Sequence, residues 1–205
     1  GQYPILEVIL RQLAACGFSR VTMAVNHQAE IIQAFFGDGS KWGVKIDYSL
    51  EDTPLSTMGP LRLISDPPED FLVMNGDILT DLDFREFFEH HVRERNIFTI
   101  SAFRRELKTE YGVLDIEGGR LIGFREKPVL CFDVSMGVYM VNRKILDYIP
   151  KGRPYGFDNL MADLLKADKP AAVRKYEGYW LDIGRPDDYM QAIEEFESLK
   201  DRFLK

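Results

Sequence analysis

The sequence is poor in cysteine and has no long apolar run. Its two cysteines, Cys16 and Cys131, lie far apart in a chain of 205 residues. Both have apolar neighbours, so we interpret them as buried free thiols of a protein kept in a reducing compartment. No stretch approaches the roughly 18 consecutive apolar residues that span a membrane, and no signal peptide is recognisable. We therefore expect a cytoplasmic protein that has no membrane as a partner.

Positive charge is also scarce. Asp and Glu outnumber Lys and Arg by 33 to 26, which gives a formal net charge of −7, and the basic residues do not cluster. Nucleic acid is therefore not an expected partner. A phosphate ligand would need a local positive group or a metal ion. With 45% apolar residues, the chain can fill the core of one globular domain.

Common catalytic motifs are missing as well. The sequence contains no activated-serine signature, no cysteine and histidine spacing typical of zinc sites, and no glycine-rich Walker or GxGxxG loop. His90 and His91 are adjacent on an expected helix, where neighbouring positions do not share a face. We interpret them as solvated side chains and not as metal ligands.

The most informative stretch is FLVMNGD, residues 71–77. Its four apolar residues predict a strand buried on both faces, as at the centre of a parallel sheet. Asn75 and Gly76 favour a sharp turn, which places Asp77 just beyond the carboxyl end of that strand. Ligands bind at this edge of open α/β sheets, so Asp77 could hold a hard cation such as Mg²⁺. The alternative is that Asp77 only caps the turn.

In the first half of the chain, periodicity predicts helices that alternate with strands. In the second half it predicts a region rich in strands. Glu117-Gly118-Gly119 indicates a hairpin. We expect one α/β domain over residues 1–205, with a Rossmann-like, mostly parallel mixed sheet flanked by helices and an antiparallel hairpin extension. The expected helices are 5–15, 29–36, a short one ending near 64, 83–95, 142–148, 158–167 and 186–204. The expected strands are 20–25, 44–48, 71–74, 97–103, 111–116, 120–125, 135–141, 171–176 and 179–182.

A second carboxylate of interest, Asp182, ends one of these short strands. Two carboxylates at strand ends, one from each half of the chain, could share a cation that bridges phosphate oxygens. Lys127 could bind a sugar phosphate as a point charge. Alternatively, Glu126 and Lys127 form a surface ion pair before a proline.

Five motifs occur in a fixed order: FLVMNGD at 71–77, YGVL at 111–114, FREKP at 124–128, SMGVY at 135–139 and YWLDIG at 179–184. Over nearly the whole chain they resemble the sugar-phosphate nucleotidyltransferase family, which includes the nucleoside-diphosphate-sugar pyrophosphorylases. The mannose-1-phosphate guanylyltransferase-like branch is the most similar. The resemblance implies that an NTP, with GTP favoured, and a sugar 1-phosphate give an NDP-sugar and pyrophosphate with the help of Mg²⁺. Glucose-1-phosphate thymidylyl- and uridylyltransferases remain alternatives, and the sequence leaves a homo-oligomer open.

The resemblance also implies roles for single residues. Asp77 and Asp182 would bind the metal, and Lys127 would contact the sugar phosphate; these three form the expected catalytic set. Glu126 would bind sugar hydroxyls, and Trp180 would line the floor near the metal. Residues 1–100 would form the nucleotide side, and residues 101–205 the sugar-phosphate side with the C-terminal helix. The other expected substrate contacts are Leu55, Thr57 and Gly59 in a base-contacting loop, together with Asn75, Gly76, Tyr111, Gly112 and Gly137.

The chain departs from the family in two places. Loop 55–59 has Ser56 and Met58 where the family has glycine and alanine, and a bulkier loop could alter the choice of base. The family also opens with a strand, a glycine-rich loop carrying an arginine and a Pro-Lys-Pro segment, which this sequence lacks. We favour a natural protein that has this segment; the alternative is a truncated or degenerate member. We expect the 205 residues alone to be poor catalysts, because losing one donor for phosphate charge costs about 10²–10³ in rate.

Two other functions remain open. Asp81-Leu82-Asp83 has the Asp-x-Asp form of metal-dependent glycosyltransferases. However, Asp83 with Glu86 three residues on is better explained as the start of a helix. The second alternative is a non-catalytic paralogue that binds an NDP-sugar without turnover.

Overall fold

The expected alternation of helices and strands is present in the computed structural model, which describes residues 3–26 and 28–204. The helices are α1 (Ile5–Ala15), α2 (Ala29–Phe36), α3 (Phe84–Glu94), α4 (Phe157–Lys166) and α5 (Pro186–Phe203), with 3₁₀ helices at Ser40–Trp42, Gly59–Leu63 and Arg143–Tyr148. The strands are β1 (Arg20–Val25), β2 (Lys45–Leu50), β3 (Asp70–Met74), β4 (Ile78–Thr80), β5 (Phe98–Lys108), β6 (Val113–Glu117), β7 (Arg120–Arg125), β8 (Val129–Asn142), β9 (Ala172–Tyr176) and β10 (Trp180–Asp182). Strand β4 was not expected. Within the described ranges no helix combines the length and apolar character needed to cross a membrane.

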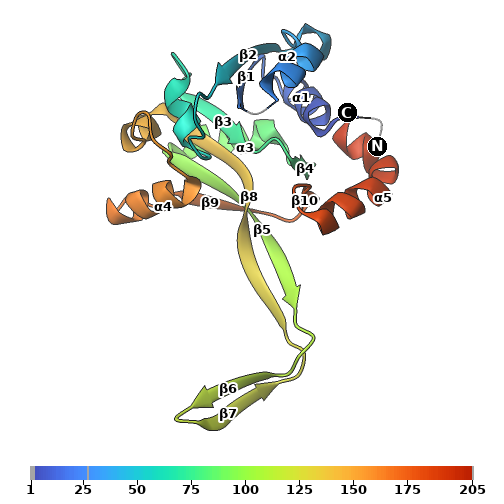
Figure 1. Ribbon diagram of the computed structural model, residues 1–205, viewed down its shortest axis with the longest axis vertical. Helices are drawn as coiled ribbons and strands as arrows, with labels where there is room; N and C mark the ends of the chain where they lie inside the picture. The colour runs from blue at the N-terminus through green and yellow to red at the C-terminus, as the bar shows by residue number, and fades with distance from the viewer. Residues whose placement is uncertain (1–2, 27, 205) are drawn as a thin grey trace.

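Parallel and antiparallel strands are combined, so the sheet is mixed as expected (Figure 1), but most of the strand pairs in the described part of the chain are antiparallel, so the expectation of a mostly parallel sheet was wrong. In the sheet β3-β8-β5-β9, strand β8 is antiparallel to both β3 and β5, and β9 is parallel to β5. Strands β1 and β2 form a parallel pair, whereas β4 with β10 and β6 with β7 are antiparallel. The α/β class and the antiparallel hairpin extension are therefore confirmed.

Strand β3 differs from its prediction in burial and pairing. All five of its residues are half-buried, and its partner β8 runs antiparallel along one edge. No second ladder joins β3 to another strand among the residues that the structure describes. The expectation of a parallel strand covered on both faces was therefore wrong for β3. Its position in the chain still places Asp77 in the turn that follows.

One core cluster unites distant parts of the chain. Ile9 from α1 and Phe84 and Phe87 from α3 are buried with Val138 of β8 and Trp180 of β10. Helix α1 also lies beside α5, where a separate cluster includes Val8, Leu181, Phe196 and Phe203. These shared cores fix β10 against the body and so position the residues at its end.

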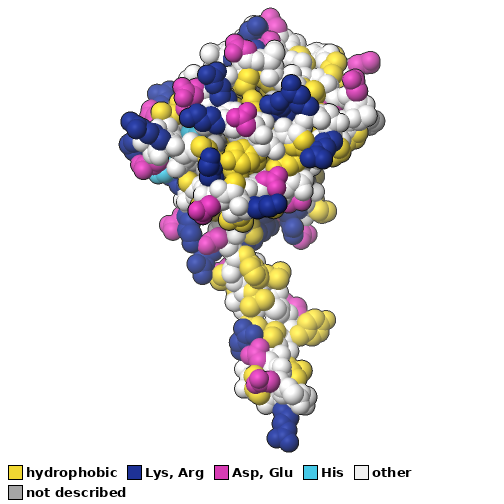
Figure 2. Space-filling view, turned by 90° about the vertical axis from the view of Figure 1, so that its left-hand side faces the viewer, with side chains coloured by type: hydrophobic (Ala, Val, Ile, Leu, Met, Phe, Trp, Pro, Cys, Tyr) yellow, Lys and Arg dark blue, Asp and Glu magenta, His cyan; other side chains and the backbone are white. Residues whose placement is uncertain are grey.

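Residues 104–133, which we call the arm, project from the body (Figure 1). The outer parts of β5 and β8 pair from Arg104 with Asp133 to Lys108 with Val129, and the β6–β7 hairpin continues the ribbon. Figure 2 shows hydrophobic side chains at the surface along the arm. Those that are exposed are Leu107, Tyr111, Leu114, Ile116, Leu121, Ile122, Phe124, Val129 and Phe132.

His91 is buried, not solvated as expected. It follows Phe84 and Phe87 on the inner stripe of α3 and has none of its surface exposed. Its Nδ1 lies 2.8 Å from Thr99 Oγ1, and its Nε2 lies 3.3 Å from Asp70 Oδ1. The spacing of an inner stripe therefore outweighed the usual preference of histidine for the surface.

The cysteines are free, but they are less buried than expected. Cys16 is half-buried at the end of α1, and Cys131 is exposed on the arm. The prediction of buried thiols was wrong for Cys131, because the two-stranded arm has no layer of structure covering it.

Candidate active site

Asp77 and Asp182 lie side by side although 105 residues separate them (182 − 77 = 105). Asp77 occupies the turn between β3 and β4, and Asp182 is the last residue of β10. Strands β4 and β10 pair antiparallel, with Asp182 opposite Ile78. The Ile183 N–H donates to the Asp77 carbonyl oxygen at 3.0 Å and closes the pair. Two short strands therefore bring the two expected site residues together.

The two carboxylates point at one position. A Cβ added at Gly184 would stand 2.8 Å from Asp77 Oδ2 and 3.2 Å from Asp182 Oδ1. Burial and the neighbouring Asp182 charge raise the pKa of the Asp77 carboxyl above its ordinary value. The pair is thus a site where a cation would relieve like-charge repulsion.

The donor set fits a hard divalent cation. Both groups offer carboxylate oxygens, and Mg²⁺ is held in proteins by one or two carboxylates together with water and substrate phosphates. No cluster of three or more His, Cys, Asp or Glu ligands occurs in the described part of the chain. A cation at this pair would therefore keep most of its coordination positions for water and phosphate oxygens.

The neighbouring expected residues are held by tight backbone contacts. Gly137 has φ +73°, and a Cβ there would lie 2.8 Å from Asn75 Nδ2, so the position needs glycine. The Asn75 N–H donates to the Gly137 carbonyl oxygen at 2.9 Å, just before Gly76. Trp180 is buried and donates from Nε1 to the Met136 carbonyl oxygen at 2.9 Å. Asn75, Gly76, Gly137 and Trp180 therefore surround the strand ends that carry the carboxylates.

The loop containing Leu55, Thr57 and Gly59 forms a second group. Its backbone pairs with Tyr155 through two hydrogen bonds. The Gly59 N–H donates to the Tyr155 carbonyl oxygen at 2.9 Å, and the Tyr155 N–H donates to the Leu55 carbonyl oxygen at 2.9 Å. Thr57 Oγ1 accepts from Phe157 N at 2.9 Å, at the start of α4. The loop is therefore fixed to the body by the chain that leads into α4.

The two departures in this loop have different consequences. Ser56 has φ +64°, in the region that glycine adopts most easily, so it keeps a glycine-like backbone. Met58 has none of its surface exposed and belongs to the core cluster around Ile145 and Tyr155. The extra bulk of Met58 is therefore directed into the core and not toward the loop surface.

Tyr111, Gly112, Glu126 and Lys127 lie on the arm. A Cβ at Gly112 would come within 3.2 Å of Glu126 Oε2, so these two residues are close together. Tyr111 is 80% exposed, and Lys127 has φ +41° where β7 turns into β8. This turn is far along the arm from the strand ends that carry Asp77 and Asp182 (Figure 1). The turn that carries Glu126 and Lys127 therefore lies apart from the carboxylate pair in the structure.

The Asp-x-Asp sequence at 81–83 serves the fold. The Asp83 side chain accepts from Glu86 N at 3.0 Å and caps α3 as predicted. Asp81 accepts from Tyr179 N at 2.7 Å, from Arg202 Nε at 3.0 Å and from the Tyr176 hydroxyl. With these donors around it, Asp81 acts as a structural link between β4 and α5.

A known protein family matches most of the chain. The description of the family is nucleotidyl transferase, and its model matches residues 1–198. The chain belongs to this family. This nucleotidyl transferase chain is 32% identical over 213 residues to a UTP–glucose-1-phosphate uridylyltransferase of Synechocystis sp., and 32% identical over 206 residues to a mannose-1-phosphate guanylyltransferase catalytic subunit beta of Dictyostelium discoideum.

The alignments cover most of this nucleotidyl transferase chain but less of its relatives. They include 94% and 93% of the chain and 55% and 57% of the two enzymes. The chain thus spans about half the length of the curated relatives it matches. A solved structure of HddC from Yersinia pseudotuberculosis complexed with GMP-PN is 25% identical with a TM-score of 0.70, and covers 94% of this chain and 85% of that one. Such neighbours identify the fold as that of nucleotide-diphospho-sugar transferases.

Sequence reasoning missed two residues at the site, Arg105 and Asp188. Asp188 accepts from the backbone N–H of Asp182 at 3.1 Å and is itself bound by Arg105. Asp188 follows Pro186 in the first turn of a predicted helix, so its acidity was consistent with a favourable charge at a helix start. Nothing local distinguishes Arg105 in a strand with several charged residues.

Proposed function

We propose that the protein containing this chain is a sugar-1-phosphate nucleotidyltransferase. It would condense an NTP with a sugar 1-phosphate to give an NDP-sugar and pyrophosphate, with GTP and mannose 1-phosphate as the favoured substrates. The observation that carries the proposal is the convergence of Asp77 and Asp182 on one position beside Gly184. Family membership supports the reaction class. A cytoplasmic location fits the two free thiols.

The choice of base and sugar is the finer part of the proposal. The guanylyltransferase from Dictyostelium and the GMP-PN complex of HddC favour a guanine nucleotide. The uridylyltransferase from Synechocystis has the same percentage identity, so UTP with glucose 1-phosphate is the second candidate. The loop at residues 55–59 would contact the base, and its attachment to the start of α4 would keep that contact rigid.

The reaction is an in-line displacement at the α-phosphorus. An oxygen of the sugar 1-phosphate forms a bond to this phosphorus while the bond to the pyrophosphate breaks. A Mg²⁺ held by Asp77 and Asp182 would offset negative charge on the phosphate oxygens. Gly184 leaves the space between the two carboxylates open, and the buried ring of Trp180 would line the floor near the metal.

The sugar side would be supplied by the arm. Glu126 would accept hydrogen bonds from sugar hydroxyls, Lys127 would contact the sugar phosphate, and Tyr111 and Gly112 would complete the contacts. In this role the arm has to bring these residues nearer to the carboxylates than they lie in the structure (Figure 1). Several of its exposed side chains are apolar, which suits a surface that becomes covered when substrate binds.

A pyrophosphate-release screen tests the proposal. The full-length protein would be incubated with Mg²⁺ and every combination of GTP, UTP and dTTP with mannose and glucose 1-phosphates. We expect release of pyrophosphate with one preferred combination, and GTP with mannose 1-phosphate ranks first. Binding of an NDP-sugar by calorimetry without pyrophosphate release would instead identify a non-catalytic paralogue. Sugar transfer from an NDP-sugar to an acceptor, without pyrophosphate, would identify a glycosyltransferase.

A further inference from the structure

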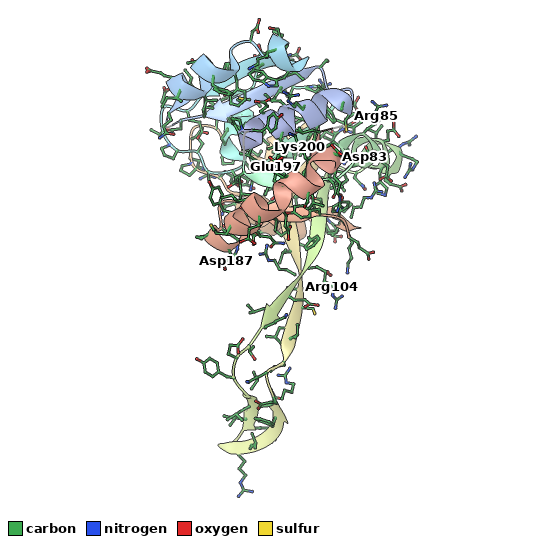
Figure 3. The ribbon with its side chains drawn as sticks, turned by 90° about the vertical axis from the view of Figure 1, so that its right-hand side faces the viewer. Asp83, Arg85, Arg104, Asp187, Glu197 and Lys200 are labelled. Carbon is green, nitrogen blue, oxygen red and sulfur yellow. The ribbon has the colours of Figure 1, made fainter. Side chains whose placement is uncertain are left out.

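An ion pair joins the arm to the first turn of α5. Arg105 of β5 donates from its two terminal nitrogens to the two carboxylate oxygens of Asp188, at 2.8 and 2.5 Å. Asp188 is the third residue of α5 and is only 3% exposed. Figure 3 labels the chain neighbours of these two residues, Asp187 at the start of α5 and Arg104 where the arm leaves the body.

This ion pair is not explained by stability alone. Asp188 is buried and Arg105 is half-buried, and because burial removes hydration from the charges, an apolar pair of similar size is often as stable. Here the guanidinium of Arg105 satisfies both Asp188 oxygens and holds the pKa of the Asp188 carboxyl below its usual range. The same guanidinium lies 5.4 Å from the centre of the Trp180 ring. The arrangement thus fixes one carboxylate in one orientation.

That orientation places an Asp188 oxygen on Asp182. Asp188 Oδ2, which binds Arg105, also accepts from the Asp182 backbone N–H at 3.1 Å. The Asp182 side chain is fixed in turn, because its Oδ1 accepts from Gly184 N at 3.1 Å. The Arg105–Asp188 pair therefore holds the backbone from which one of the two converging carboxylates projects.

We propose that Arg105 and Asp188 are positioning residues for the divalent-cation site, in which Arg105 orients Asp188 and Asp188 fixes Asp182 in the geometry that binds the cation. The inference rests on the proposed function, because it takes Asp77 and Asp182 as the cation ligands. Groups that orient metal ligands through hydrogen bonds affect metal affinity by about 10- to 100-fold. Arg105 and Asp188 fit this description without touching the cation.

The test must separate positioning from charge, because removing either partner alone changes the local field. The double variant Arg105→Met/Asp188→Leu keeps the net charge of the pair at zero and removes the acceptor for Asp182 N. Binding of Mn²⁺ to the chain, without nucleotide, is measured by electron paramagnetic resonance. We expect affinity about 10-fold weaker than in the wild type, with a similar melting temperature.

Two further variants identify the cause. Arg105→Met/Asp188→Asn has the same net charge but restores an amide oxygen for the Asp182 N–H, and its affinity should lie between wild type and the leucine variant. The matched control is Lys175→Met/Asp133→Leu. It removes a different ion pair, of 2.6 Å, between β9 and the inner end of the arm, and it should bind Mn²⁺ as the wild type does.

The outcomes distinguish this inference from the proposed function. Wild-type affinity in the Arg105→Met/Asp188→Leu variant would overturn the positioning role and leave the cation site intact. If the leucine variant has a lower melting temperature, the variant Arg105→Met/Asp188→Ala removes the same acceptor without overpacking. Wild-type Mn²⁺ affinity in this alanine variant would likewise overturn the positioning role. Failure of the wild-type chain to bind Mn²⁺ would overturn the cation site itself, and with it both proposals.

Discussion

Asp77 and Asp182 direct their carboxylates at the place where a side chain at Gly184 would begin. The distances from that point are 2.8 Å to Asp77 Oδ2 and 3.2 Å to Asp182 Oδ1. A single methyl group would therefore occupy the space that a shared cation needs. The atoms that it meets are the ends of side chains, which can move without disturbing the backbone.

Gly184→Ala should accordingly damage the site and leave the fold. We expect Mn²⁺ affinity to fall, and turnover of the full-length protein to fall by about 10²-fold, since a displacement of about 1 Å can cost that much. The melting temperature should stay close to that of the wild type. Mn²⁺ titration and thermal unfolding of the same sample check both parts, and wild-type Mn²⁺ affinity would contradict the shared position.

Lys127→Ala tests the role proposed for the arm. Loss of a charged hydrogen bond to the sugar phosphate should raise the KM for sugar 1-phosphate by about 10- to 100-fold, with little change in the KM for NTP. Steady-state kinetics of the full-length protein measure both constants. The matched control is Arg125→Ala, which removes a cation of the same hairpin that pairs with Asp115 at 3.2 Å. A change confined to the KM for NTP would show that Lys127 contacts the nucleotide and not the sugar phosphate.

Asp81→Ala should behave in the opposite way to a change at the cation site. Burial raises the pKa of the Asp81 carboxyl, but hydrogen bonds from Tyr176 and from the Tyr179 backbone outweigh this effect. The pKa therefore lies below its ordinary value. The substitution removes these hydrogen bonds and also the ion pair between Asp81 and Arg202. It should therefore lower the free energy of unfolding by about 3 kcal/mol. Chemical denaturation measures that loss. Weakened Mn²⁺ binding by the folded variant would revive Asp81 as a metal ligand and with it the glycosyltransferase alternative.

His91 should make stability depend on pH. Burial outweighs the nearby Asp70 carboxylate and lowers the pKa of His91 below its ordinary 6.5. The unfolded chain therefore binds a proton more readily, and stability is complete above about pH 6.5 and decreases as pH falls below it. Denaturation between about pH 7 and pH 5 should show this decrease in the wild type.

The variant His91→Gln should begin less stable at pH 7 and lose less on acidification. Equal slopes in wild type and His91→Gln would mean that another group is responsible for the acid sensitivity.

The sequence was sufficient where local pattern decides structure. Apolar periodicity located most helices and strands, and the Asp83 cap was recognisable from Glu86 three residues later. The positions of Asp77 and Asp182 at strand ends were predicted in the same way. Their meeting required the β4–β10 pair, and β4 was not predicted because Ile78–Thr80 is too short for a periodic signal.

The sequence was insufficient where distant residues decide. Arg105 and Asp188 are 83 positions apart, and no local pattern relates them. Strand β5 was expected to end at Phe103, yet its ladder with β8 continues through several charged residues to Lys108. Position 91 had the spacing of an inner helical stripe, but the preference of histidine for the surface decided the prediction.

The most direct test of the account is a Mn²⁺ titration of four proteins: wild type, Asp77→Asn, Asp182→Asn and the double variant. A cation shared by both carboxylates predicts one site in the wild type. Each single substitution should greatly weaken Mn²⁺ binding at this site. The double variant should bind little more weakly than either single variant, because the two ligands act as a unit. Wild-type affinity in either single variant would contradict a shared cation and the enzymatic function derived from it.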